Sequence, residues 1–200
     1  MDELSKCLAG EYYDCHDKIF LAFKGRAQKL LKQYHTLAYE EKEAKTNILR
    51  QLFGGLGSEV SVAMPFCCDY GRNIYIGNQV SVNMNCTFVD CNTITIGDRV
   101  LIGPNVQLYT ATHPIELTER LFPSIRDGKP VYSRRTYAKP IKIGDGCWLG
   151  GGVVVLPGVT IGAGSVIGAG SVVTRDISPD SLAVGNPCRV IRKLNQEKKK

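Results

Sequence analysis

The stretch IGDGCWLGGGVVVLPGVTIGAGSVIGAGSVV, residues 143–173, carries an unbroken repeat of six residues. An aliphatic residue returns at every sixth position, and a glycine directly follows four of the six. The aliphatic positions are Ile143, Leu149, Val155, Ile161, Ile167 and Val173. A period of six fits neither the 3.6-residue period of a helix nor the simple alternation of a long strand. The repeat therefore predicts short strands separated by turns, with one inward side chain per strand.

The same repeat continues toward the N-terminus with a change of phase. The earlier positions are Ile76, Val82 and Phe88, followed after two extra residues by Ile96, Ile102 and Leu108. Three such sixes, each bending the chain by about 120°, close one triangular coil, so residues 18 apart stack on one another. Backbone groups then pair between coils. We therefore predict a mainly β fold, a left-handed parallel β-helix, in preference to an ordinary β-sandwich.

The N-terminal quarter of the chain has a helical period instead. After Asp17, a suitable N-cap, the apolar residues of one helix face are Ile19, Phe20, Phe23, Ala27, Leu30, Leu31 and Tyr34. A second helix is predicted from about Tyr39 to Phe53, ended by Gly54 and Gly55. We expect three parts: a helical cap at 1–56, a β-helix at 57–177 with an inserted loop at 110–140, and an extended C-terminal segment with a basic tail at 178–200.

Composition and charge narrow the class of protein. The net charge is +6, part of it in the tail RKLNQEKKK, which suits an anionic small ligand as well as a nucleic acid. With no nucleic-acid motif and few interleaved aromatics, we expect no nucleic acid partner. No window approaches the roughly 20 apolar residues of a membrane span, and no signal-peptide layout is present, which predicts a cytoplasmic protein without membrane contact. The 8 scattered cysteines are interpreted as reduced, mostly buried thiols rather than a disulfide framework.

Several ordered motifs resemble one enzyme family. They are LAGEYYD (8–14), PFCCDYGRNIYIGN (65–78), VNMNCTFVD (82–90), IGPNVQLYTATHP (102–114), the repeat stretch at 143–177 and GNPCRVIRKL (185–194). This set resembles the maltose and galactoside O-acetyltransferases, which belong to the hexapeptide-repeat acyltransferases. The resemblance implies a homotrimer with active sites in clefts between neighbouring prisms, acetyl-CoA as donor, a sugar-like hydroxyl as acceptor and no metal requirement.

Acetyl transfer to a hydroxyl needs a base and a donor to the developing oxyanion. His113 stands where the repeat breaks; its residue type alone leaves a structural role equally open, and the family motif identifies it as the base. His16 and His35 are interpreted as surface imidazoles of the helical cap. Asn83 matches the family asparagine beside the acetyl carbonyl, although the residues alone favour a turn asparagine. Asn85 keeps that turn interpretation.

The acceptor and donor contacts follow from the same resemblance. Carboxylates that bind sugar hydroxyls are predicted at Asp14, Asp69 and Asp90, with Cys91 beside them, although each aspartate is also a plausible turn or cap residue. The galactoside branch has a second aspartate at Cys91 and a serine at Asp69, so we favour the maltose branch. The resemblance implies that the CoA contacts are Asn83, Trp148, Gly151, Ala169, Thr174, Arg175, Arg189 and Arg192.

Some of these assignments keep alternatives. Arg189 and Arg192 either clamp a phosphate or form a solvated face, and Trp148 either floors the cleft or packs between subunits. The inserted loop is longer than the family pattern, and its Arg134, Arg135 and Lys139 either extend the CoA cleft or keep the loop solvated.

Three rival functions were weighed against a sugar O-acetyltransferase. One is a relative that acetylates an antibiotic, and another is a noncatalytic scaffold subunit. The third, a zinc hydratase on the same prism, would need about three histidine ligands on the coil walls. Only His113 is available there.

Overall fold

A computed structural model describes residues 1–126 and 128–194 of the chain. Asp127 and the final residues of the basic tail, 195–200, lie outside the described residues. The described chain forms the left-handed parallel β-helix that the repeat predicts, together with N-terminal helices and a long excursion.

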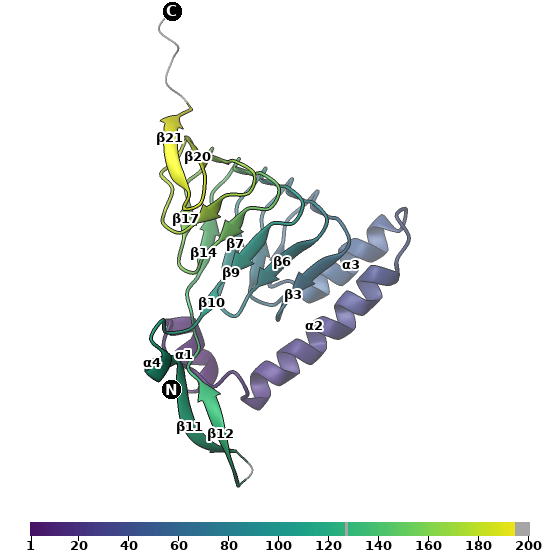
Figure 1. The fold of residues 1–200 in the computed structure, drawn as a ribbon. Coiled ribbons are helices and arrows are strands. Elements are labelled where there is room, and N and C mark those ends of the chain that lie inside the picture. Colours follow the sequence, from purple (N-terminus) through teal and green to yellow (C-terminus); the bar gives the residue numbers. More distant parts are fainter. Residues whose placement is uncertain (127, 195–200) are drawn as a thin grey trace, which may run out of the picture.

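The β-helix has three walls of parallel strands (Figure 1). The first wall contains β1 (Gly55–Leu56), β4 (Ile74–Ile76), β7 (Ile94–Ile96), β14 (Ile141–Ile143) and β17 (Thr160–Ile161). The second contains β2 (Ser61–Val62), β5 (Ser81–Val82), β8 (Leu101–Ile102), β15 (Trp148–Leu149), β18 (Val166–Ile167) and β20 (Ser181–Val184), with β21 (Arg189–Lys193) added antiparallel to β20. The third contains β3 (Phe66–Cys68), β6 (Cys86–Val89), β9 (Gln107–Tyr109), β16 (Val154–Val155) and β19 (Val172–Val173).

The aliphatic residues at the repeat positions predicted from the six-residue period form the core of the prism. Every one of those positions, from Ile76 to Val173, is buried. Ile143 pairs with Ile161 and Leu149 with Ile167, 18 residues apart as predicted. The stack also extends past the predicted limits, because β1 begins at Gly55 and β20 adds a further strand beyond residue 177.

The change of phase after Phe88 reflects wider coils near the N-terminal end. Ile76 pairs with Ile96 and Phe88 with Leu108, so these coils contain 20 residues rather than 18. The extra residues lie at the corner between the third and first walls, where Tyr70 and Asp90 are buried. This wide corner is the place where the N-terminal segment docks.

Three helices precede the β-helix: α1 (Glu3–Ala9), α2 (Lys18–Thr36) and α3 (Lys42–Leu52). Asp17 caps α2 as predicted, since its carboxylate accepts the Ile19 N–H at 2.9 Å. The helix α3 begins later than predicted, because the Glu41 side chain accepts the Ala38 N–H at 2.6 Å and holds a turn there.

The helices α2 and α3 cover the first coil (Figure 1). Buried side chains of both helices, including Leu31 and Leu52, join the prism core, and the Tyr34 hydroxyl donates to the Val62 carbonyl at 2.5 Å. The helices thus hide an end of the sheet that would otherwise expose unpaired backbone groups.

The long interruption of the repeat is a folded excursion between β9 and β14. It contains β10 (Ala111–Thr112), α4 (Leu117–Arg120), β11 (Leu121–Arg126), β12 (Lys129–Arg134) and β13 (Tyr137–Ala138). The strands β11 and β12 form an antiparallel hairpin that projects away from the prism (Figure 1). At its root β10 pairs with β13, so the excursion leaves and rejoins the wall at nearly the same point.

The structure also describes the cysteines and the apolar character of the helices. All the cysteines are free thiols and most are buried, with Cys67 exposed. Within the described ranges, no helix combines the length and the apolar character needed to cross a membrane.

The close stacking of the corners makes a testable prediction about glycine. A Cβ atom on Gly150 would lie 2.6 Å from the Ala169 backbone nitrogen, so we expect Gly150→Ala to lower the free energy of unfolding by about 1–3 kcal/mol. The control is Gly25→Ala on the exposed face of α2, where a Cβ meets nothing within 4 Å. Alanine there should stabilise the helix by roughly 0.5–1 kcal/mol. Urea unfolding of both variants checks the pair, and equal stability of the two would contradict the stacking argument.

Candidate active site

His113 follows β10 at the root of the excursion, and its side chain is exposed. Its Nδ1 lies 2.7 Å from the Arg135 carbonyl oxygen and 3.4 Å from Thr136 Oγ1. Because a carbonyl oxygen can only accept, Nδ1 carries the proton in this hydrogen bond. In the neutral ring Nε2 therefore keeps its lone pair, so His113 is held in the tautomer that can accept a proton at Nε2.

Arg135, whose carbonyl orients His113, is itself held through its side chain and its backbone N–H. The Arg135 guanidinium carbon lies 5.6 Å from the centre of the Tyr12 ring and 5.5 Å from that of Phe122, within the range of cation–π attraction. The Arg135 N–H also donates to the Arg120 carbonyl at 2.9 Å. The N-terminal segment and the hairpin together therefore fix the group that orients His113.

The N-terminal segment brings Asp14 to the same place. The Tyr13 N–H donates to the Thr136 carbonyl at 3.1 Å, and Thr136 is the residue whose hydroxyl faces the His113 ring. Asp14 follows directly, with its side chain 61% exposed. The predicted base and one predicted acceptor carboxylate thus converge within a single chain.

Asp14 lines a pocket of about 620 Å³ between the N-terminal segment and the hairpin, which we call the hairpin pocket. Its lining also includes Tyr12, His16, Phe122, Arg134 and Arg135. Aromatic rings, carboxylates and cations therefore surround one cavity, next to the carbonyl that orients His113.

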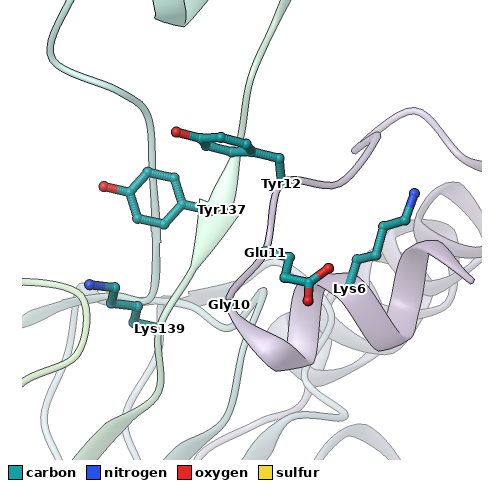
Figure 2. Close-up of a pocket in the computed structure, with 6 residues that line it drawn as sticks. All are labelled: Lys6, Gly10, Glu11, Tyr12, Tyr137 and Lys139. Carbon is teal, nitrogen blue, oxygen red and sulfur yellow. The ribbon is translucent and has the colours of Figure 1, made fainter. Parts of the chain in front are cut away.

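A second pocket, of about 510 Å³, is also lined by Tyr12 (Figure 2). The rings of Tyr12 and Tyr137 meet edge to face there, with centroids 5.7 Å apart. Lys139 extends beside Tyr137, its Nζ 5.9 Å from the ring centre. Tyr12 and Lys6 thus line both pockets.

Asn83 occupies the corner between the second and third walls. Its side chain is exposed, and its Oδ1 accepts the Met84 N–H at 2.8 Å, which leaves the amide NH₂ group as the outward donor. The left-handed turn conformation falls on Asn85, with φ of 60°. Gly151 and Ala169 lie at the same corner in later coils. The coils are connected there by one ladder of backbone hydrogen bonds, in which the Asn83 N–H donates to the Ile102 carbonyl and the Gly150 N–H donates to the Ile167 carbonyl.

The two predicted catalytic residues lie at opposite edges of the third wall. Val82 pairs with Ile102, so Asn83 is level with Gly103, whereas His113 lies beyond Leu108. Between these two positions the chain passes through a turn and then through β9, which crosses the third wall. One chain therefore does not present His113 and Asn83 to the same acetyl group. Thr174 and Arg175 follow β19 and lie on the His113 edge.

The outer face of the second wall carries the remaining predicted donor contacts. Trp148 is 53% exposed and sits between Leu101 and Val166. Arg192 pairs with Leu182 and Arg189 with Val184, because the register of β21 shifts between Leu182 and Ala183. This irregularity places two arginines that are three apart in sequence on the same side of the sheet, since Leu182 and Val184 share a face.

Comparison with known proteins agrees with this geometry. Residues 6–57 match the model of the maltose acetyltransferase hexapeptide capping motif, and residues 140–175 match that of the bacterial transferase hexapeptide (six repeats). A maltose O-acetyltransferase from Clostridium difficile 630 is 44% identical, with a TM-score of 0.89 over 98% of this chain and 99% of that one. The chain belongs to the maltose and galactoside O-acetyltransferase family.

Two further solved structures support the assignment of this acetyltransferase. A hexapeptide-repeat acetyltransferase from Vibrio cholerae, solved with acetyl-CoA, is 40% identical with a TM-score of 0.84, covering 98% of this chain and 100% of that one. A galactoside acetyltransferase solved with coenzyme A is 38% identical with a TM-score of 0.88, covering 98% of this chain and 92% of that one.

In this acetyltransferase the structure corrects the direct acceptor contact predicted for Asp90. The Asp90 side chain is 0% exposed, and its carboxylate accepts the backbone N–H groups of Tyr70 at 2.8 Å and Asn73 at 3.2 Å. Burial raises the pKa of Asp90 to about 6, against the opposing effect of these backbone donors. Asp90 therefore shapes the wide corner from inside.

Cys91 is likewise placed below the surface, at 5% exposure. Its thiol donates to Asp69 Oδ2 at 3.3 Å, and burial, with the nearby Asp69 charge, raises the pKa of Cys91 well above its usual range. Cys91 is thus a neutral donor that holds Asp69. Asp69 itself remains partly exposed, 3.9 Å from the Lys24 ammonium, and can still face a ligand.

Sequence reasoning missed the residues that support His113. Arg135 was noted only for its charge, whereas the structure uses its carbonyl, and a carbonyl carries no residue-specific signal. Tyr12 lies in the quoted EYYD motif, but its contact with a cation 123 positions later in the chain has no local signature. The aromatic partner Phe122 lies in the part of the excursion where the family pattern gave no guidance.

The buried Asp90 carboxyl predicts a pH-dependent stability. Because its folded pKa of about 6 lies above the ordinary value of 3.8, ionisation costs stability once the pH passes through that window. As the pH rises from 4 to 7, the free energy of unfolding of Asp90→Asn should therefore increase relative to that of the natural chain, by up to about 3 kcal/mol. Urea unfolding across this range checks the slope. A gap that stays constant with pH would contradict it, because the amide's altered hydrogen bonding adds only a pH-independent offset.

Proposed function

We propose that this acetyltransferase moves the acetyl group of acetyl-CoA to a hydroxyl of a maltose- or glucose-like sugar, with His113 as general base. The observation that carries the proposal is the His113 ring, held by the Arg135 carbonyl with Nε2 left as a proton acceptor, beside a pocket that contains Asp14. A neutral imidazole in this tautomer is what proton abstraction from an alcohol needs.

The reaction follows from these groups. The His113 Nε2 accepts the proton of the acceptor hydroxyl while the hydroxyl oxygen forms a bond to the thioester carbonyl carbon. The amide NH₂ of Asn83 donates to the oxyanion that develops on the carbonyl oxygen. The intermediate then collapses, the carbon–sulfur bond breaks, and the proton passes from His113 to the leaving sulfur. The products are the acetyl ester and CoA, and no charge is left on the histidine.

The lining of the hairpin pocket supports our assignment of the acceptor to it. Asp14 supplies an exposed carboxylate for a charge-assisted hydrogen bond to a sugar hydroxyl, and Tyr12 and Phe122 offer ring faces to the apolar side of a sugar. Asp69, held by the Cys91 thiol, is a partly exposed carboxylate at the wide corner between the third and first walls. A serine in place of Asp69 would suit the galactoside branch, so this chain favours a maltose-type acceptor.

The donor is assigned to the Asn83 corner and the second wall. Gly151 and Ala169 are small residues at exposed or partly exposed positions in one vertical line, which lets a pantetheine arm lie close to the backbone. Arg189 and Arg192 on one side of β21 supply cations for the CoA phosphates. The related acetyltransferases solved with acetyl-CoA and coenzyme A support this choice of donor.

A homotrimer completes the site in this proposal. Because His113 and Asn83 lie at opposite edges of one wall, the base must come from one chain and the oxyanion donor from the next. A threefold arrangement of prisms places the His113 edge of each copy against the Asn83 edge of its neighbour, and a closed ring of heterologous contacts gives three equal sites. Thr174 and Arg175, on the His113 edge, then reach the donor held by the neighbouring copy.

The proposed substrate class is tested by following release of the CoA thiol from acetyl-CoA. The acceptor panel contains maltose, glucose, galactosides and antibiotic alcohols, with acetyl-CoA alone as the blank. We expect turnover above the blank with maltose or glucose and weaker turnover with galactosides. Turnover only with an antibiotic alcohol would replace the sugar by a xenobiotic acceptor, and absence of turnover with every acceptor would favour a noncatalytic scaffold.

The shared site is tested by mixing two inactive variants. His113→Ala and Asn83→Ala should each lower kcat by on the order of 10²–10⁴, since each removes one group from the transition state. When the two chains are co-expressed in equal amounts, about one quarter of the sites regain both groups if the site lies between subunits.

Purified mixed assemblies should then show up to roughly that share of the natural activity. Activity no higher than that of either variant alone would place both groups in one subunit. Co-expression of His113→Ala with itself, carrying two different affinity tags, provides the matched control for assembly.

A further inference from the structure

We propose that the turn Asp14–Cys15–His16 binds a Zn²⁺ ion at the rim of the hairpin pocket. The three side chains offer a carboxylate oxygen, a sulfur and an imidazole nitrogen that all lie within 4.8 Å of one another. Asp14 and His16 are exposed and Cys15 is partly buried, so an ion can reach all three from solvent.

The two distances from His16 Nδ1 to the other ligand atoms fit one tetrahedral ion. Asp14 Oδ1 lies 3.3 Å from His16 Nδ1, and Cys15 Sγ lies 3.6 Å from the same nitrogen. Tetrahedral Zn²⁺ with bonds of about 2.0–2.1 Å to nitrogen or oxygen and 2.3 Å to sulfur sets its N and O ligands about 3.3 Å apart and its N and S ligands about 3.6 Å apart. His16 Nδ1 therefore already lies at a suitable distance from both other ligand atoms, and all three stay within 4.8 Å of one another.

The chemistry of the donor set selects the metal. A thiolate, an imidazole and a carboxylate together suit a borderline-soft cation such as Zn²⁺, whereas Mg²⁺ and Ca²⁺ take oxygen ligands almost exclusively. Three protein ligands leave the fourth position to water. The ion is thus held by one short turn, with one side open to the pocket.

The turn is fixed at both ends, which lowers the cost of gathering the ligands. On one side, the Tyr13 N–H donates to the Thr136 carbonyl at 3.1 Å. On the other side, the Asp17 N–H donates to the Asp14 carbonyl at 3.1 Å, and Asp17 caps the long helix α2. Little conformational entropy remains to be lost when the ion binds.

The position of the ion gives it a consequence for catalysis, which rests on the proposed function. Asp14 is the carboxylate assigned to the acceptor hydroxyl, so a bound ion occupies the same side chain. Occupation of the turn should therefore compete with the acceptor. None of the residues assigned to the donor belongs to the turn, so binding of acetyl-CoA should be unaffected.

Binding is tested directly on the full chain, without any assay of activity. Zn²⁺ is titrated in the presence of a competing chromophoric chelator, and Co²⁺ is used as a spectroscopic probe. We expect one ion per chain, with thiolate-to-cobalt charge-transfer absorption and the intense visible bands of a tetrahedral site. Cys15→Ser should abolish the charge-transfer absorption and weaken Zn²⁺ binding by on the order of ten-fold or more, and His16→Gln should also weaken it.

Cys67→Ser is the matched control, because Cys67 is an exposed thiol on the third wall, away from the turn. This control should bind Zn²⁺ as the natural chain does. Unchanged affinity in Cys15→Ser, or lost affinity in Cys67→Ser, would overturn the proposed site.

The kinetic consequence separates this proposal from the proposed function. Zn²⁺ should raise the KM for the acceptor without raising the KM for acetyl-CoA, and Cys15→Ser should be less sensitive to the ion. Inhibition that instead raises the KM for acetyl-CoA would overturn the location of the ion. If no acceptor on the panel is acetylated, the proposed function fails, while the titration and the cobalt spectrum still decide whether the turn binds metal.

Discussion

Each coil of the β-helix rests on the previous one through backbone hydrogen bonds at its corners, and the rest of the structure depends on this contact. The Gly150 N–H donates to Ile167 at 2.8 Å, and the corner is so close that a Cβ at Gly150 would meet Ala169. Inside, the stacked aliphatic residues exclude water and hold the three walls at fixed positions. This rigidity separates Asn83 from His113 within one chain, so completing the proposed site requires a second copy.

The break in the repeat is where a rigid wall meets an adaptable segment. The paired strands β10 and β13 anchor the excursion. Arg135 lies just before β13, and its carbonyl orients the His113 ring. Tyr12 and Phe122 hold the Arg135 side chain from either side. The proposed base, His113, therefore sits on a firm support, whereas the hairpin beyond it forms one side of the pocket that we assign to the acceptor. Variation in the hairpin can alter that pocket without disturbing the prism.

The candidate site could be predicted from the sequence only in part. His113, Asn83 and Asp14 were identified by their motifs, and the structure leaves all three exposed; their roles remain proposals. Asp90 and Cys91 belong to the same motifs, yet both are buried, because the wide corner folds inward against the N-terminal segment. The two extra residues before Ile96 were visible in the sequence, but nothing local showed that they enlarge a corner and receive Tyr13 and Tyr70.

The sequence by itself determined the β-helix, its core of stacked aliphatic residues and the helix cap at Asp17. Each of these follows from a short local period or from neighbouring residues. Tertiary structure alone decided which groups meet at the site. The contact of Tyr13 with Thr136 and of His113 with Arg135 joins segments far apart in the chain. Such contacts use backbone carbonyl and N–H groups that every residue possesses, so their partners are chosen by the packing of the whole fold and leave no pattern in the sequence.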